Sequence, residues 1–192
     1  KVLGGEGAHG VLILSPRAVE RLESHTPQWP MPKLFRMTKG GKLNEEIFTG
    51  ATINTPSMFC VEDYIDALKW AEHLGGIEAL YARADANAAA LHDWVEATDW
   101  IDYLCANPGL RSNTSVCLKI VDPDVTALDD AGQRAIVKAM EKLLESKGAA
   151  YDIGGYRDAP PGLRVWCGAT VETADIKALG PWLDWAFSQA KG

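Results

Sequence analysis

Two arginines late in the chain are the side chains best suited to bind a small anion. Arg157 and Arg164 flank a proline-containing turn that joins two apolar runs. A guanidinium presents a planar fork of donors that matches a carboxylate or a phosphate. Arg164 is surrounded by apolar residues, so its charge needs a partner. That partner is either a ligand or an internal carboxylate such as Asp158 or Glu172, and the sequence alone leaves both open.

Three other segments could approach an anion through backbone amides. Residues 1–10 are glycine-rich, which suits close approach to a ligand but also a flexible terminus. Residues 54–57 (Asn-Thr-Pro-Ser) precede an expected helix, whose first amides attract phosphate or carboxylate. Capping of that helix by Asn54 or Thr55 would explain the same residues. Residues 111–115 are most simply a turn closed by side-chain hydrogen bonds.

Composition limits the possible partners. The net charge of -7 and the pI of about 5.1 disfavour a nucleic-acid partner. The sequence holds no apolar run of the ~20 residues that a membrane span requires, so no membrane partner is expected. Cys60, Cys105, Cys117 and Cys167 lie far apart without metal-ligand spacing, which predicts reduced thiols, no metal site and a cytoplasmic location.

Secondary structure can be expected from periodicity and from proline and glycine positions. The expected strands are residues 11–14, 115–121, 151–153 and 163–167. The expected helices are residues 16–24, 57–74, 77–97, 129–147 and 173–190. Residues 26–32, with three prolines, should be extended or turned, and residues 35–48 should be an irregular surface segment. The order of elements after about residue 97 is that of a small α+β domain.

The linear order of these segments resembles the phosphoserine aminotransferases, pyridoxal-phosphate enzymes of serine biosynthesis. In that family a lysine and a glycine-rich turn precede a strand, an Asn-Thr-Pro run opens a long helix, and two arginines surround a late turn. The matching residues are Lys1–Gly7, Asn54-Thr55-Pro56, Gly75-Gly76, Arg111-Ser112, Arg157, Arg164 and Gly168-Ala169-Thr170. One position departs from the pattern, because the family commonly has histidine where this chain has Tyr156.

The resemblance implies a role for each matching site residue. Lys1 would form the Schiff base with pyridoxal 5'-phosphate and move the substrate proton, since a desolvated lysine can act as nucleophile and base. Asn54 and Thr55 would bind the cofactor phosphate of a second subunit. Arg164 would pair with the substrate α-carboxylate, and Arg157 would help to bind the phosphate or distal carboxylate. The implied reaction moves an amino group from glutamate to 3-phosphohydroxypyruvate, giving phosphoserine and 2-oxoglutarate.

The resemblance also implies an α/β fold of the aspartate-aminotransferase type, which is pyridoxal-phosphate fold type I. Residues 1–97 would be the C-terminal part of the large cofactor domain with connecting helices, and residues 98–192 would be the small C-terminal α+β domain. The expected partners are the N-terminal half of the same enzyme and a second copy in a homodimer. The alternatives are an alanine–glyoxylate aminotransferase, a cysteine-desulfurase-like enzyme, or a non-catalytic anion-binding fragment.

Overall fold

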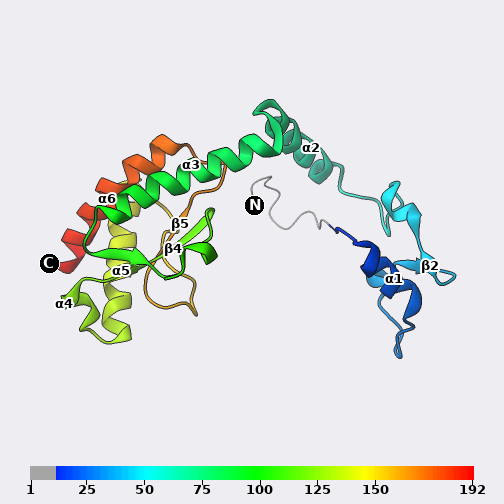
Figure 1. Cartoon of the computed structure of the whole chain (residues 1–192), viewed down its shortest axis with the longest axis horizontal. Helices are drawn as coiled ribbons and strands as arrows, with labels where there is room; N and C mark the ends of the chain where they lie inside the picture. The colour runs from blue at the N-terminus through cyan, green and yellow to red at the C-terminus, as the bar shows by residue number, and fades with distance from the viewer. Residues whose placement is uncertain (1–11) are drawn as a thin grey trace. The chain divides into compact units, whose positions relative to one another are not determined.

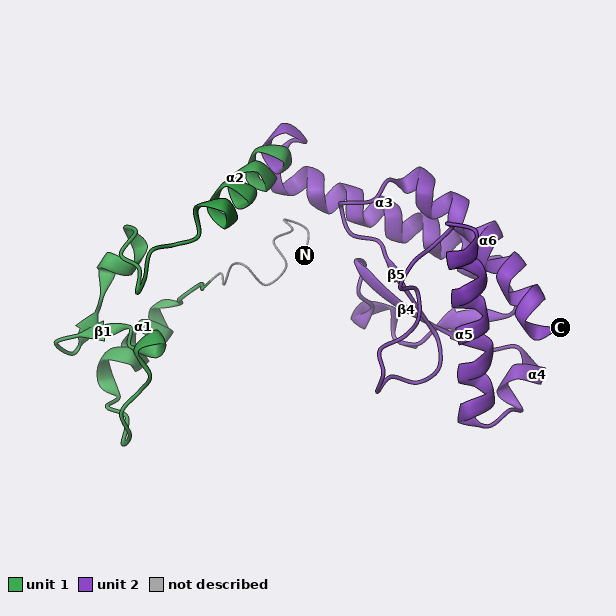
Figure 2. Ribbon diagram, turned by 180° about the vertical axis from the view of Figure 1, so that it is seen from behind, with its two compact units in different colours: residues 1, 3–70 green, residues 2, 71–192 purple. Residues whose placement is uncertain are grey.

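The computed structural model describes residues 12–192, which fall into two compact units (Figures 1 and 2). Unit 1 covers the described residues up to Trp70, and unit 2 covers Ala71–Gly192. The expected strand at 11–14 is wrong for residues 12–14, which have no regular secondary structure; Val11 lies outside the described residues. Ile13 is 89% exposed, because no described strand pairs with this segment.

Unit 1 begins with helix α1, Pro16–Ser24, as predicted. The Ser15 hydroxyl accepts a hydrogen bond from the Ala18 backbone amide at 3.2 Å and so caps the helix. Proline at the first helical position also suits the helix start. Glu23 links the helix to a later strand: its carboxylate lies 2.8 Å from Lys42 Nζ and accepts from the Leu43 amide at 3.0 Å. These contacts hold α1 against the rest of unit 1.

A small hairpin occupies the middle of the segment that was expected to be irregular. Strand β1, Thr38–Lys39, pairs antiparallel with β2, Lys42–Leu43. Gly40 and Gly41 join them with φ of 62° and 79°. Two consecutive positive φ values are those of the tight hairpin turn that glycine favours. Short 3-10 helices, η1 at Lys33–Phe35 and η2 at Glu45–Phe48, flank the hairpin.

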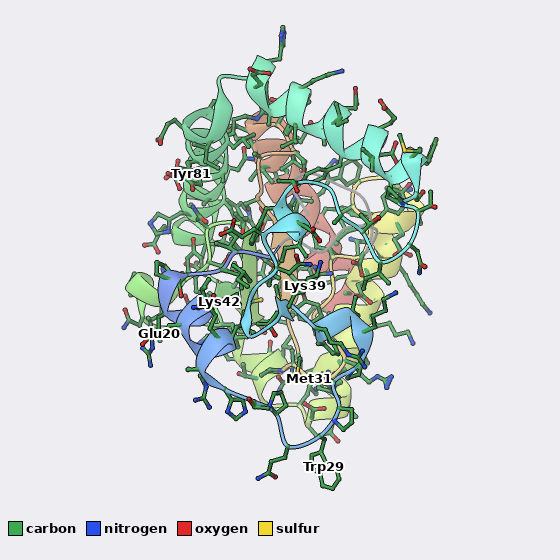
Figure 3. The ribbon with its side chains drawn as sticks, turned by 90° about the vertical axis from the view of Figure 1, so that its right-hand side faces the viewer. Glu20, Trp29, Met31, Lys39, Lys42 and Tyr81 are labelled. Atoms are coloured by element: carbon green, nitrogen blue, oxygen red, sulfur yellow. The ribbon has the colours of Figure 1, made fainter. Side chains whose placement is uncertain are left out.

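The described part of unit 1 has no interior of its own. None of its described residues is buried, although several large apolar side chains belong to it. Trp29 is 80% exposed and projects from the loop after α1 (Figure 3). The other large apolar side chains of unit 1 that are more than half exposed include Leu34, Phe35, Phe48, Met58 and Phe59.

Two long helices follow, close to their predicted bounds. Helix α2 spans Met58–His73 and α3 spans Gly76–Glu96. Gly75, just before α3, and Gly76, its first residue, have φ of 112° and 76°, the left-handed values that end a preceding helix at glycine. The predicted stop at these two glycines is therefore confirmed.

Unit 2 is a three-stranded antiparallel sheet with helices α3, α5 and α6. The sheet order is β3 (Ile101–Tyr103), β4 (Ser115–Ile120), β5 (Leu163–Trp166). Burial alternates along β4, so Val116 and Leu118 face the core. A single cluster joins this face to apolar side chains of the helices: Leu91, Val95, Val137, Met140, Leu144, Leu183 and Phe187.

The helices of unit 2 largely match the predicted ones. Helix α5 spans Asp130–Ser146 and α6 spans Thr173–Lys191. Strand β3 and the short helix α4, Pro123–Thr126, were not predicted. The expected strand at 151–153 is wrong: only Gly154 forms an isolated bridge, because Asp152 adopts a φ of +51° that interrupts extended backbone.

Helices α3 and α6 pack closely through a glycine and two tryptophans. A Cβ on Gly180 would lie 2.6 Å from Trp94 Cδ1, so only glycine permits this approach. Asp184 accepts from Trp94 Nε1 at 3.2 Å and from Trp100 Nε1 at 3.0 Å. The polar edges of both indoles are thereby satisfied while their rings fill the space between the helices.

Candidate functional site

Arg164 lies on β5, at the sheet edge next to the loop from residue 152 to 162. Its Nη2 lies 2.8 Å from Asp152 Oδ2 and also donates to the Asp152 backbone carbonyl at 3.3 Å. The Arg164 side chain is 11% exposed, whereas that of Asp152 is 91% exposed. The internal partner is therefore Asp152 and neither Asp158 nor Glu172, which were the expected candidates.

The remaining surroundings of Arg164 leave donor capacity on the guanidinium. The Arg164 Nε is buried and has no hydrogen-bond partner among the described residues. The ring of Tyr156 lies against the guanidinium, with 4.6 Å between Arg164 Cζ and the ring centroid. Only Nη2 is engaged by the internal carboxylate, so the guanidinium keeps donors with which to bind a carboxylate.

Arg157 occupies a different environment, at the corner of an exposed turn. The Ala159 amide donates to the Tyr156 carbonyl at 3.0 Å, which closes the turn around Arg157. The Arg157 guanidinium makes no hydrogen bond or ion pair with the described residues. Arg134 of α5 anchors the turn by donating from Nη2 to the Ala159 carbonyl at 2.9 Å. Asp130, 2.6 Å from Arg134 Nε, fixes the anchoring side chain.

The loop after β5 is held by helix α3. The buried Asn87 donates from Nδ2 to the carbonyls of Cys167, Gly168 and Val171 at 3.2, 3.2 and 3.0 Å. Its Oδ1 accepts from the Thr173 hydroxyl at 2.7 Å. These bonds tie helix α3 to the loop that follows the Arg164 strand and fix that loop, in which the Gly168 carbonyl also accepts from the Val171 amide at 3.3 Å.

An arginine one turn earlier on α3 strengthens the same attachment. Arg83 donates from Nε to the Ala169 carbonyl at 2.9 Å and from Nη2 to Glu172 Oε1 at 2.6 Å. The hydrogen bond from Arg83 lowers the pKa of the Glu172 carboxyl. Glu172 therefore pairs with Arg83 and not with Arg164.

Arg111 has a structural role in this arrangement. Its Nε donates to the Cys105 carbonyl at 2.9 Å, and its Cζ lies 3.8 Å from the centroid of the Tyr103 ring. Burial raises the pKa of Tyr103. The predicted turn at 111–115 is confirmed, since Ser112 Oγ accepts from the Ser115 amide at 3.1 Å.

Asn54 and Thr55 belong to unit 1, just before α2. Both side chains are exposed and make no hydrogen bond with the described residues. The expectation that Asn54 or Thr55 caps helix α2 is wrong. The residue in the capping position is Ser57, whose Oγ accepts from the Cys60 amide at 3.5 Å. The side chains of Asn54 and Thr55 are therefore available to a ligand.

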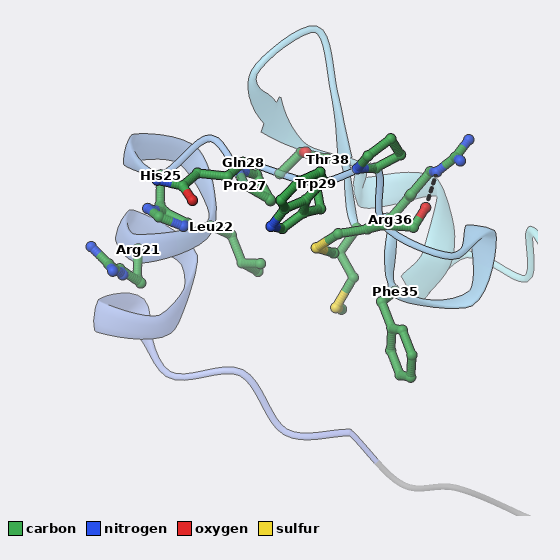
Figure 4. A pocket seen from close by; sticks show the side chains of 12 residues that line it. Arg21, Leu22, His25, Pro27, Gln28, Trp29, Phe35, Arg36 and Thr38 are labelled. Atoms are coloured by element: carbon green, nitrogen blue, oxygen red, sulfur yellow. Dashed lines mark hydrogen bonds between the residues drawn. The ribbon is translucent and has the colours of Figure 1, made fainter.

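Unit 1 also contains a cavity of about 580 Å³ (Figure 4). Leu22, Trp29, Met31 and Phe35 give it an apolar lining, and Arg21, His25 and Arg36 give it a polar rim. Arg36 Nε donates to the Met31 carbonyl at 2.7 Å and so orders one side. None of the predicted site residues lines this cavity.

Arg157 and Arg164 both belong to unit 2, seven residues apart in sequence, and Asn54 and Thr55 belong to unit 1. Lys1 lies outside the described residues. The described part of the chain holds no cluster of three potential metal ligands, and no helix in residues 12–192 is long and apolar enough to cross a membrane. The four cysteines form no disulfide.

The contributing residues that were not anticipated from the sequence include Asn87, Arg134 and Asp152. Asn87 shares a helix face with Ala84 and Leu91, three residues before and four residues after it. A polar residue at helical spacing within an apolar stripe signals a buried hydrogen-bonding role. Asp152 and Arg134 carry no comparable signal, because their partners lie across turns whose course the sequence does not specify.

Solved structures with a similar fold define the class. Phosphoserine aminotransferase from Bacillus circulans subsp. alkalophilus matches with a TM-score of 0.58 at 21% identity, over 72% of this chain and 35% of that one. A pyridoxal-phosphate-bound phosphoserine aminotransferase from Trichomonas vaginalis matches with a TM-score of 0.60 at 17% identity, over 72% and 36%. The fold is that of a pyridoxal-phosphate fold type I aminotransferase, as predicted.

Curated relatives then identify the particular enzyme that the chain resembles. Phosphoserine aminotransferases of Methanosarcina mazei and Methanosarcina barkeri are each 53% identical over 191 residues, which is 100% of this chain. The chain spans about half the length of these relatives, 49% in each case. No family model matches the sequence. The predicted resemblance is confirmed: the chain is similar along its whole length to the C-terminal half of phosphoserine aminotransferases.

Proposed function

We propose that this chain supplies the C-terminal half of a phosphoserine aminotransferase. The proposed reaction transfers an amino group from glutamate to 3-phosphohydroxypyruvate, giving phosphoserine and 2-oxoglutarate in serine biosynthesis. The observation that carries the proposal is the 53% identity to curated enzymes of that name over the whole chain. The two arginines of unit 2 support it, because these substrates all carry at least two anionic groups.

Arg164 is proposed to bind the substrate α-carboxylate. Its guanidinium is nearly buried, so a carboxylate that reaches it is shielded from water and interacts strongly. Asp152 engages one nitrogen and leaves other donors for the ligand. Arg157 is proposed to bind the distal carboxylate or the phosphate, since it is exposed and its charge is not neutralised by any described residue.

Pyridoxal 5'-phosphate is the cofactor that this function requires, and the described donors fit its phosphate. Asn54 and Thr55 offer an amide and a hydroxyl just before α2, where the positive end of the helix dipole also attracts an anion. When bound, this cofactor supplies an electron sink for the substrate Cα. Lys1 is proposed to hold the cofactor and to move the proton at that carbon.

We further propose that the enzyme is a homodimer in which Asn54 and Thr55 serve the cofactor of the other subunit. The exposed apolar side chains of unit 1 support an extensive interface, since such side chains usually lie against another surface. The proposed domain division is residues 1–97 and 98–192, and a cytoplasmic location accords with four cysteines that form no disulfide. Solution scattering should show a dimer of the complete enzyme; a monomeric holoenzyme would contradict the proposed site.

The activity is tested on the complete enzyme reconstituted with pyridoxal phosphate. Glutamate should serve as amino donor to 3-phosphohydroxypyruvate, and glyoxylate should be a poor acceptor. Lys1→Ala should abolish transfer and prevent attachment of the cofactor under borohydride reduction, as read by intact mass. Preference for glyoxylate, or a reduced adduct at a different lysine, would refute the proposed function.

A further inference from the structure

Tyr156 contacts the proposed α-carboxylate arginine through its ring. The ring centroid lies 4.6 Å from Arg164 Cζ, within the range of a cation–π contact. The Tyr156 side chain is otherwise open, with the residue 58% exposed. Its hydroxyl forms no hydrogen bond with the described residues. The contact that Tyr156 makes with Arg164 is therefore made by its aromatic face.

Two groups confine the guanidinium of Arg164, and they act in different ways. Asp152 binds one nitrogen, Nη2, through its carboxylate and its carbonyl. The described hydrogen bonds therefore hold the guanidinium at one nitrogen, since Nε has no described hydrogen-bond partner. The Tyr156 ring supplies the missing restraint, because a guanidinium against an aromatic face can move only at the cost of that contact.

Tyr156 is itself held in place by its neighbours. The Gly155 amide donates to the Gly162 carbonyl at 3.1 Å, and the Tyr156 carbonyl accepts from the Ala159 amide at 3.0 Å. Arg134 ties the same turn to α5. The ring thus stands on a segment with a fixed backbone, as a side chain that orients another must.

Building on the proposed function, we propose that Tyr156 is a positioning residue for Arg164 and thereby for the α-carboxylate of every substrate. The alternative is a ligand of the substrate phosphate, which would act through the hydroxyl. The two roles differ in their substrate dependence. An α-carboxylate is common to all amino donors, whereas a phosphate occurs only in phosphoserine among them.

The test compares Tyr156→Phe with Tyr156→Ala in the complete holoenzyme, using glutamate and phosphoserine as donors. Tyr156→Phe keeps the ring and should leave kcat/KM for both donors within about twofold of wild type. Tyr156→Ala removes the ring and should lower kcat/KM about fivefold for both donors alike, mainly through KM. Tyr151→Ala removes another exposed tyrosine of the region and should leave kcat/KM unchanged for both donors.

A double-mutant cycle with Arg164→Lys shows whether Tyr156 acts through Arg164. Because lysine lacks the planar fork, adding Tyr156→Ala to Arg164→Lys should cause little further loss. Additive losses would overturn the positioning role. A loss for phosphoserine alone in Tyr156→Phe, or wild-type kinetics in Tyr156→Ala, would overturn it too. A wild-type enzyme that does not transaminate either donor would instead refute the proposed function.

Discussion

Units 1 and 2 differ in what holds them together. In unit 2, a sheet and three helices enclose a core with Met140, Leu144 and Leu183 at 0% exposure. In unit 1, none of the described residues is buried, and its order comes from local turns and from Glu23 contacts to the hairpin. Unit 2 can therefore fold from its own apolar burial, whereas unit 1 needs a further surface to cover Trp29 and its neighbours.

A matched pair of leucine truncations gives the largest expected contrast. Leu183→Ala in unit 2 should lower the free energy of unfolding of the 192-residue chain by about 3 kcal/mol, because it opens a cavity in a closed core. Leu34→Ala in unit 1 removes a side chain that is 69% exposed and should change it by less than ~0.5 kcal/mol. Urea unfolding measures both, and equal losses would mean that unit 1 has an interior of its own.

Asn87 tests whether polar contacts matter in unit 2 as much as apolar ones. Asn87→Ala should cost about 2 kcal/mol in urea unfolding, because it removes the hydrogen-bond donor that the carbonyls of Cys167 and Val171 share in the loop after β5. The control is Asn113→Ala, which removes an exposed bond to Asp85 of 2.6 Å. If Asn113→Ala lowers the free energy of unfolding as much as Asn87→Ala does, burial is not the reason that the Asn87 hydrogen bonds stabilise the fold.

Thiol labelling compares the units without any substitution. Burial raises the pKa of Cys167 to about 12, so little thiolate forms at pH 8, and the side chain is also fully enclosed. Cys60 on α2 is only half-buried. In the 192-residue chain, Cys60 should react with a maleimide before Cys167, which should react only at the rate of unfolding of unit 2. Comparable labelling rates under native conditions would contradict the closed core.

The smallest expected effect is on the stability at low pH and arises at Glu172. The hydrogen bond from Arg83 lowers the pKa of this carboxyl below its ordinary 4.5, so the folded state binds the proton less readily than the unfolded state. The stabilisation is present above about pH 4.5 and is lost as the pH falls through the folded pKa. Glu172→Gln should remove this part of the acid dependence in unfolding curves. An unchanged acid dependence would argue against the pair in solution.

Helices that depend on local signals could be predicted, whereas features that depend on distant partners could not. Pro16, the pair Gly75-Gly76 and Gly148 mark helix bounds within the chain itself, and the predicted bounds are within a few residues of the observed ones. The segment 12–14 has the composition of a strand, but strand formation requires a neighbouring strand, and none of the described strands pairs with it.

The candidate site shows the same division. Arg164 could be identified as an anion-binding candidate, because a charge among apolar residues needs a partner. Its internal partner could not be identified, since Asp152 lies twelve residues away across a turn and adopts a positive φ that the sequence does not signal. The assignments of Lys1, Asn54 and Thr55 remain predictions that rest on the resemblance.

The packing of α6 on α3 has a consequence for synthesis on the ribosome. Asp184 joins Trp94 and Trp100 across 90 and 84 residues of chain, and Leu183 fills the core beside them. Translation proceeds from the N-terminus, so α3 and the sheet emerge before α6 exists to cover them. The nascent chain must therefore carry an open apolar face until α6 is made, and during that interval chaperone binding would protect it from aggregation.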